Sequence, residues 1–190
     1  MTISSRRGES VVKIDEQPGK ANPDKIPTLR PAFAKDGTVT AANASSISDG
    51  AAALLVMTRE KAENLGLKPM AVIKAHSSHA QAPNMFTHAP VGAIEKVLEK
   101  SSWSLADIDL FEINEAFAMV TLAAMNALEI PHEKVNIHGG ATALGHPIGA
   151  SGARIVVTLL HALQRIGKTK GLATLCIGGG EAVAITVEML

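Results

Sequence analysis

Apolar side chains follow regular patterns mainly in the second part of the chain. The first forty residues are polar and interrupted by four prolines, so they offer no regular apolar pattern from which a core could form. From about residue 70 onward, apolar positions recur with the periods of helices and strands. The patterns predict helices over residues 58–65, 91–100, 114–128 and 151–166, and strands over 72–76, 110–113, 135–137, 172–177 and 182–189.

The order of these elements predicts the fold class. Strands and helices alternate, and the chain ends in two consecutive strands, which is typical of an α/β unit with a mixed sheet flanked by helices. The glycines at 178–180 allow an antiparallel return between the last two strands, and the final strand is expected to point Val183 and every second residue after it inward. The helix over 114–128 is apolar or small nearly all round, which predicts burial on most of its sides.

The composition argues against several classes of protein. The 190 residues carry 18 basic and 18 acidic side chains and only 3% aromatic residues, which argues against a nucleic-acid partner. A single cysteine excludes a disulfide framework and suits a reducing compartment. The N-terminus lacks the apolar core of a signal peptide, and the apolar run over 155–163 is too short to cross a bilayer. We therefore expect a cytoplasmic protein with no membrane partner.

The stretch from 136 to 155 carries the clearest sign of chemistry. Five glycines lie in the stretch from Gly139 to Gly152, and they surround His146, which is followed by proline. Glycine is used where the backbone approaches another group closely or adopts a positive φ. The pattern predicts a fixed imidazole in a tight turn just before a helix, although a structural histidine in a glycine-rich turn would show the same pattern.

Two further turns carry polar side chains that could join this histidine. Asn114 follows the strand over 110–113, and Cys176 ends the strand over 172–177 just before three glycines. Asn114 could instead be an ordinary N-cap of the next helix, and Cys176 could be a small buried apolar residue. The residues alone leave the two interpretations of Cys176 evenly balanced. The histidines at 76, 79 and 88 have no acidic or cysteine neighbours at ligand spacing, so no metal site is expected.

The three motifs Asn-Glu-Ala-Phe, Gly-His-Pro and Cys-Ile-Gly-Gly-Gly resemble those of the thiolases, which are coenzyme A-dependent acyltransferases. The similarity runs in order from about residue 6 to residue 190 and implies the layered α-β-α fold of that family. It implies that residues 1–42 are the end of a coenzyme A-binding loop region. Residues 43–69 would be the last elements of the N-terminal domain, and 70–190 would be the C-terminal domain. The helices beginning at 114 and 151 would pack against the N-terminal domain in a shared helix layer.

The resemblance also implies catalytic roles. Cys176 would remove the Cα proton of an acyl-CoA and return it in the reverse direction. His146 would activate a nucleophilic thiol and, with a water held by Asn114, would stabilise the enolate oxygen. The backbone N–H of Gly178 would supply half of a second oxyanion hole. The implied reactions are condensation of two acetyl-CoA molecules to acetoacetyl-CoA and thiolysis of a 3-ketoacyl-CoA.

Three further residues would bind the substrate by the same resemblance. Arg6 would lie against the adenine and phosphate end of coenzyme A, Ser45 would contact the pantetheine, and Phe86 would lie beside the acyl group. The coenzyme A thioester would be the substrate, with no covalently bound cofactor. The protein would be a homo-oligomer, a dimer or a tetramer.

The cysteine count departs from the family. Thiolases use two cysteines, and this chain has one, Cys176, at the position of the second. The nucleophilic cysteine is therefore expected in an N-terminal half outside these residues, and the chain alone is expected to be inactive. One alternative is a non-catalytic short form that acts as an oligomerisation or interaction module, and another is a fragment of a longer thiolase. A ketosynthase relative is disfavoured, because those enzymes have histidines where Asn114 and Cys176 stand.

Overall fold

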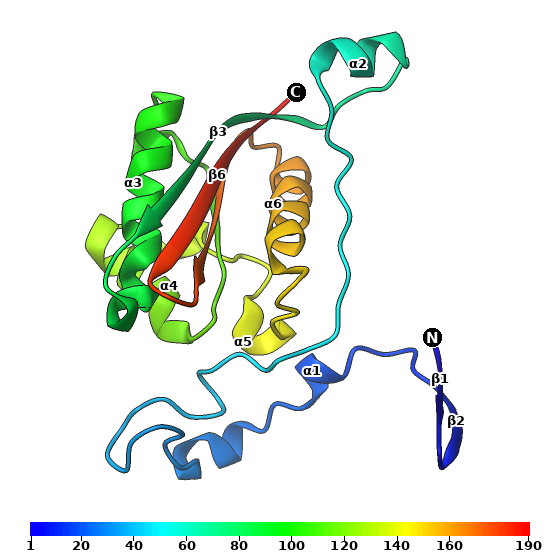
Figure 1. The fold of residues 1–190 in the computed structure, drawn as a ribbon, viewed down its shortest axis with the longest axis vertical. Coiled ribbons are helices and arrows are strands. Elements are labelled where there is room, and N and C mark those ends of the chain that lie inside the picture. The colour runs from blue at the N-terminus through cyan, green and yellow to red at the C-terminus, as the bar shows by residue number, and fades with distance from the viewer.

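One mixed four-stranded sheet forms the centre of the chain in the computed structural model, which describes residues 1–190 (Figure 1). The strand order across the sheet is β3-β6-β5-β4. The central pairs β3–β6 and β6–β5 are antiparallel, and β5–β4 is parallel. The bounds are Ala71–Ala80 for β3, Leu110–Ile113 for β4, Lys170–Ile177 for β5 and Glu181–Met189 for β6. The mixed α/β sheet predicted from the sequence is confirmed.

Helices cover both faces of this sheet. On one face lie α3 (Ala89–Ser101) and α4 (Ala118–Leu128), and on the other lies α6 (Ser151–Ile166) (Figure 1). In β4 the side chains alternate accordingly, because successive residues of a strand point to opposite faces. Phe111 packs under α3 and α4, whereas Leu110 packs under α6.

Burial on both faces also corrects the prediction for the last strand. The alternation in β6 was expected to turn Val183, Ile185, Val187 and Met189 inward. Val187 is buried in the core under α6, and Ile185 and Met189 pack against that core, whereas Val183 is only half-buried. The intervening Ala182 and Ala184 are fully or nearly fully buried and belong to the core under α3 and α4. A sheet with helices on both faces has two inward directions, so its strands do not show one apolar and one polar side.

The first forty residues contain no buried side chain and contribute nothing to the core, as their sequence pattern predicts. They form a hairpin of two short strands, a single helical turn and a 3₁₀ segment. The bounds are Thr2–Ser5 for β1, Gly8–Val11 for β2, Glu16–Gly19 for α1 and Pro23–Thr28 for η1. Figure 1 shows the hairpin apart from the α/β body, whereas the helical turn α1 contacts α5 (Ala141–Leu144).

An extended segment then leads to a short helix. Residues 49–57 have no regular secondary structure, and Leu55 and Val56 remain 82% and 67% exposed. Figure 1 shows this segment rising as a bare ribbon to α2 (Arg59–Asn64). The helix begins where its sequence predicts, because the Thr58 side chain accepts the backbone N–H of Lys61.

The connections between the main elements are short helical turns. They are η2 (Pro83–His88), η3 (Leu105–Asp107), η4 (His132–Lys134) and α5 (Ala141–Leu144). Ser104 and Asp107 form a capping box at η3. The turn α5 was not foreseen; it lies between Gly140 and Gly145 and leads into the His146 turn.

Two predicted elements differ from the structure. The helix expected from residue 114 begins at Ala118, with Phe117 at its N-cap, so Asn114 does not cap it. The burial predicted for most of its sides is also wrong, since Met119 and Leu122 are 46% and 55% exposed. The strand expected over 135–137 is reduced to one bridge between Val135 and Phe111, because Asn136 adopts a φ of 47° and leaves the extended conformation.

Candidate active site

His146 lies in a turn that is fixed by its backbone. Its N–H donates to the carbonyl of Ser46 (2.8 Å), and Ile47 forms a bridge with it. The preceding Gly145 has a φ of 88°, and a Cβ there would overlap the Ser48 hydroxyl. A side chain at 145 is therefore excluded both by backbone conformation and by the close approach of the segment over 46–48.

The hydrogen bonds of the imidazole assign its protons. His146 Nδ1 lies 2.6 Å from Ser151 Oγ, and that hydroxyl donates to the carbonyl of Pro147 (3.1 Å). Because the single hydroxyl proton is used in that bond, Ser151 Oγ accepts from Nδ1–H. Nε2 then carries a free lone pair, which accepts from the amide Nδ2 of Asn114 at 3.3 Å. His146 is thus a neutral imidazole with its basic nitrogen turned toward Asn114.

The surroundings of His146 favour this neutral form. Burial lowers the pKa of the imidazole, and the positive charge of Arg154 lowers it further. A neutral imidazole can accept a proton from a thiol, and once protonated it can donate to an oxyanion.

Asn114 stands at the carboxyl end of β4. Its backbone N–H donates to the carbonyl of Thr174 on β5 (3.0 Å), and its side chain is 1% exposed. Its amide oxygen faces Nη2 of Arg154 at 3.5 Å. The nitrogen of this buried amide therefore has a partner on the His146 loop, and its oxygen has a partner on α6.

Glu115 ties the Asn114 turn to the loop that precedes His146. Its carboxylate accepts from the Asn136 side chain (3.2 Å) and from the backbone N–H of Thr142 (3.0 Å). The Asn136 side chain in turn accepts from the backbone N–H of Ile113 and donates to the carbonyl of Ile113, at 2.9 Å each. The carboxylate occupies the place where a side chain at Gly140 would be, since a Cβ there would overlap it.

We expect Gly140→Ala to destabilise the chain by about 1–3 kcal/mol, the cost of leaving buried hydrogen-bonding groups without partners. The new methyl group would displace the Glu115 carboxylate from both its donors. Urea unfolding measures the effect. Gly149→Ala is the matched control, because it lies in the same loop and a Cβ there meets nothing within 4 Å. Equal stability of the two variants would show that the Glu115 bonds do not hold the loop.

Cys176 lies at the carboxyl end of β5, beside the end of β4. It is 8% exposed and belongs to the core under α3 and α4. It stands two residues beyond Thr174, whose carbonyl holds Asn114. Burial raises the pKa of its thiol, so the resting group is protonated. The buried position fits the structural interpretation of this cysteine, and its place at the same sheet edge as Asn114 fits the catalytic one.

The glycines after Cys176 shape the return to β6. Gly180 has a φ of 96°, and a Cβ there would overlap the carbonyl of Gln81. Gly178 is exposed, and a Cβ there would meet nothing within 4 Å. Space beside Gly178 is therefore open to another molecule.

Two of the residues expected to bind substrate lie near the Asn114 turn. Ser45 directs both its N–H (3.2 Å) and its hydroxyl (3.0 Å) to the carbonyl of Ala116. The Phe86 ring lies edge-on to the ring of Phe117, with centroids 6.3 Å apart. Arg6 is not brought to this place: it is exposed at the tip of the β1–β2 hairpin (Figure 1).

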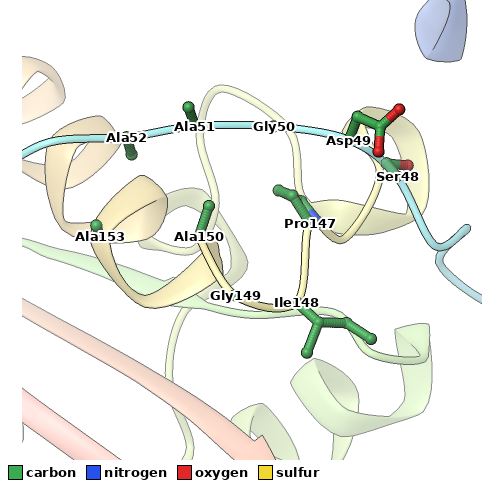
Figure 2. A pocket seen from close by; sticks show the side chains of 10 residues that line it. All are labelled: Ser48, Asp49, Gly50, Ala51, Ala52, Pro147, Ile148, Gly149, Ala150 and Ala153. Carbon is green, nitrogen blue, oxygen red and sulfur yellow. The ribbon is translucent and has the colours of Figure 1, made fainter.

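An open cavity of about 420 Å³ adjoins the His146 turn, between residues 48–52 and 147–153 (Figure 2). Figure 2 shows the two segments on opposite sides, with Pro147 directed toward the upper one. Gly50 lies against that ring, since a Cβ there would be 2.8 Å from Pro147. Small side chains such as Ala51 and Ala150 leave the space wide.

Sequence reasoning missed Ser151, Glu112 and Arg154. Ser151 was read only as the start of a helix, although its place five residues after His146 brings it back to the imidazole. Glu112 was signalled by a carboxylate within an otherwise apolar strand, and it is 2% exposed. No group of three or more His, Cys, Asp or Glu side chains is gathered as a metal site would require. None of the helices is long and apolar enough to cross a membrane.

Known proteins resemble the whole chain in both sequence and structure. A "Probable acetyl-CoA acyltransferase" of Staphylococcus aureus (strain NCTC 8325) is 53% identical over 190 residues, which cover 99% of this chain and 48% of the relative. The crystal structure of the Bacillus anthracis acetyl-CoA acetyltransferase is 49% identical with a TM-score of 0.93, and it covers 100% of this chain and 48% of that one. Human mitochondrial 3-ketoacyl-CoA thiolase, solved in complex with CoA, is 36% identical with a TM-score of 0.87 over 100% of this chain and 48% of its own.

The chain thus spans about half the length of the relatives it matches. The family model of the thiolase C-terminal domain matches residues 67–189, and that of the thiolase N-terminal domain matches residues 1–60. Together with the Asn114, His146 and Cys176 turns at one edge of a mixed sheet, these matches establish that the chain belongs to the thiolase family.

Proposed function

We propose that this chain supplies the enolate-forming half of a thiolase-type acyltransferase that acts on coenzyme A thioesters. The reaction is condensation of two acetyl-CoA molecules to acetoacetyl-CoA, or the reverse thiolysis of a 3-ketoacyl-CoA. The observation that carries the proposal is the 3.3 Å approach of Asn114 Nδ2 to His146 Nε2 at the strand edge where Cys176 lies. Proton removal next to a thioester requires a base for the Cα proton and hydrogen-bond donors for the enolate oxygen, and residues at this sheet edge could supply both.

In condensation, Cys176 as thiolate takes a proton from Cα of acetyl-CoA, and the electron pair moves to the thioester oxygen. His146 and a water on Asn114 stabilise that oxyanion. In thiolysis the Cys176 thiol returns the proton to the departing Cα. The raised pKa of the buried thiol suits this acid role, and formation of the thiolate in the other direction requires the bound substrate.

The remaining residues are proposed to position the thioester. Ser45 and Phe86 lie at the Asn114 turn and would contact the pantetheine and the acyl group. The exposed N–H of Gly178 would serve a second oxyanion. Arg6 would reach the adenine and phosphate end from its hairpin. Residues 70–190 would form the C-terminal domain, preceded by the end of the N-terminal domain over 43–69.

The acyl group needs a second thiol as its carrier. These 190 residues contain one cysteine, and the proposal assigns it to proton transfer. Turnover therefore needs further thiolase sequence that bears the acylatable cysteine, and we expect the 190 residues by themselves to have no thiolase activity.

A chimeric enzyme tests the proposal. The N-terminal part of the Staphylococcus aureus relative would be joined to these 190 residues, which match 48% of that protein at 53% identity. We expect the chimera to cleave acetoacetyl-CoA in the presence of coenzyme A, and the 190 residues alone to be inactive. A folded chimera without thiolysis would contradict the proposal.

A second candidate function is a non-catalytic association module, favoured by the apolar side chains at the surface. Leu55, Met119, Leu122 and Ile148 are 82%, 46%, 55% and 65% exposed. On this proposal the 190 residues form a homo-oligomer through these side chains. Sedimentation velocity would show an oligomer that Leu122→Glu dissociates, whereas a monodisperse monomer would exclude the module.

A further inference from the structure

Arg154 is a charged residue in the first turns of α6, next to the buried amide of Asn114. It is only half-exposed, and its Nε and Nη1 atoms are buried without a hydrogen-bond partner. Its directed contact to another side chain is from Nη2 to the amide oxygen of Asn114, at 3.5 Å. Burying guanidinium donors without partners costs free energy, so packing alone gives no reason for an arginine at this place.

The charge that faces Arg154 comes from β4. Glu112 lies between residues that pack under α3 and α4, so its side chain points to the α6 face of the sheet. Desolvation raises the pKa of Glu112 to about 7, although the Arg154 charge acts against this rise. The two side chains are electrostatic neighbours without forming an ion pair, and Arg154 directs a donor to Asn114 instead.

The orientation of the Asn114 amide has two alternatives that differ in their protons. With Nδ2 toward His146, the imidazole carries its proton on Nδ1 and donates to Ser151. With the amide reversed, His146 would carry its proton on Nε2, and Nδ1 would need the Ser151 proton that now goes to Pro147. A neutral histidine and an amide permit either arrangement.

We propose that Arg154 is a positioning residue that selects the first arrangement. A guanidinium donates hydrogen bonds and accepts none, so the group of Asn114 that faces it must be the amide oxygen. The amide Nδ2 then faces His146, whose unprotonated Nε2 accepts from it. Arg154 thereby keeps the basic nitrogen of His146 turned toward the reaction. The catalytic meaning of this arrangement rests on the proposed function, but the arrangement itself does not.

The same arginine has a second effect on the imidazole. Its charge lowers the pKa of His146, in addition to the effect of burial. The other charged or titratable groups near this place are Glu112 on β4, Glu115 in the following turn and Cys176 on β5. The directional effect on the amide is measured by the tautomer of His146, and the charge effect on the imidazole by its titration midpoint.

Nuclear magnetic resonance of the ¹⁵N-labelled 190-residue chain tests the proposal, because long-range ¹H–¹⁵N correlations distinguish the two tautomers. The wild-type chain is expected to show His146 only as the Nδ1–H tautomer. In Arg154→Met this single pattern is lost to a mixture, and the titration midpoint rises. In Arg154→Gln the new side chain can accept as well as donate, so the tautomer selection is also lost and the midpoint rises. Arg154→Lys keeps both the single tautomer and the titration midpoint, because lysine is a positively charged donor that accepts no hydrogen bond.

Arg165→Met is the matched control, since it removes an exposed arginine from the last turn of the same helix. It should change neither the tautomer nor the midpoint. A single unchanged tautomer in Arg154→Met would overturn the proposal. If that variant does not fold, a single unchanged tautomer in folded Arg154→Gln, or a mixed tautomer in folded Arg154→Lys, would overturn it equally.

The chimera adds a kinetic measurement. We expect Arg154→Met to lower kcat by on the order of 10–100-fold with KM for the thioester unchanged, because it misplaces a reacting group without touching the substrate. An inactive chimera with the expected tautomer pattern would contradict the proposed function alone. An active chimera whose kcat is unaffected by Arg154→Met would contradict the positioning role alone.

Discussion

Cys176→Ala in the chimeric enzyme is expected to abolish the condensation of acetyl-CoA while acyl-enzyme formation continues. A positioned acid or base contributes on the order of 10²–10⁴-fold to a rate, and alanine offers no replacement for the thiol. Acylation uses the other cysteine and needs only His146 as its base. Mass spectrometry of the acyl-enzyme and the rate of acetoacetyl-CoA formation measure the two steps separately.

The neighbouring Ile177→Ala is the control for local disturbance of the β5 end, because Ile177 is 38% exposed and carries no chemistry. Its condensation rate should stay close to that of the unmodified chimera. Condensation that survives in Cys176→Ala would remove this cysteine from proton transfer and leave it as a residue of the core.

Glu112→Gln is expected to remove a large part of the pH dependence of folding stability. The pKa of Glu112 is raised from 4.5 to about 7, chiefly by desolvation. Between these values the folded chain binds more protons than the unfolded chain, so the free energy of unfolding falls as pH rises through this window. The contribution is complete below pH 4.5 and is lost above about pH 7. Its size is on the order of 3 kcal/mol, since each pKa unit corresponds to about 1.4 kcal/mol.

The variant should therefore be more stable than the wild-type chain at pH 8 and nearly equal to it at pH 4.5. Urea unfolding at a series of pH values measures this difference. His146 acts in the opposite direction, because its lowered pKa makes the free energy of unfolding rise with pH. Both chains contain His146, so subtracting the pH curve of Glu112→Gln from that of the wild-type chain removes its contribution. Glu99→Gln, which changes an exposed carboxylate on α3, is the control. Parallel curves for wild type and Glu112→Gln would show that Glu112 is not desolvated.

The sequence predicted elements best where local signals and tertiary contacts agree. The helix over 151–166 and the strand over 110–113 have the predicted bounds, since their apolar periods match the surfaces they bury. The helix expected at Asn114 begins four residues later because tertiary contacts hold the turn open. The N–H of Ala118 donates to the carbonyl of Asn43, and Ser45 binds Ala116. Asn43 and Ser45 are distant in sequence from the start of this helix, so no local pattern predicts their effect.

The candidate site could be predicted as a set of residues but not as a network. Glycine and proline around His146 and the strand ends at Asn114 and Cys176 are local signals, and the structure places Asn114 beside His146. The roles of Ser151 and Arg154 depend on how α6 crosses the sheet, which residue spacing does not contain. Glu112 was visible as a carboxylate in a buried strand, but the charge of Arg154 on α6, which opposes the rise of its pKa, became apparent only in the fold.

The central claim is that Cys176, His146 and Asn114 together convert bound acetyl-CoA to its enolate, and that this step does not need the acylatable cysteine. Exchange of the acetyl-CoA methyl protons in D₂O measures this most directly, in a chimera whose acylatable cysteine is replaced by alanine. The account predicts exchange in this chimera and its loss in Cys176→Ala and in His146→Ala. Exchange that continues at the same rate without Cys176 would contradict the account.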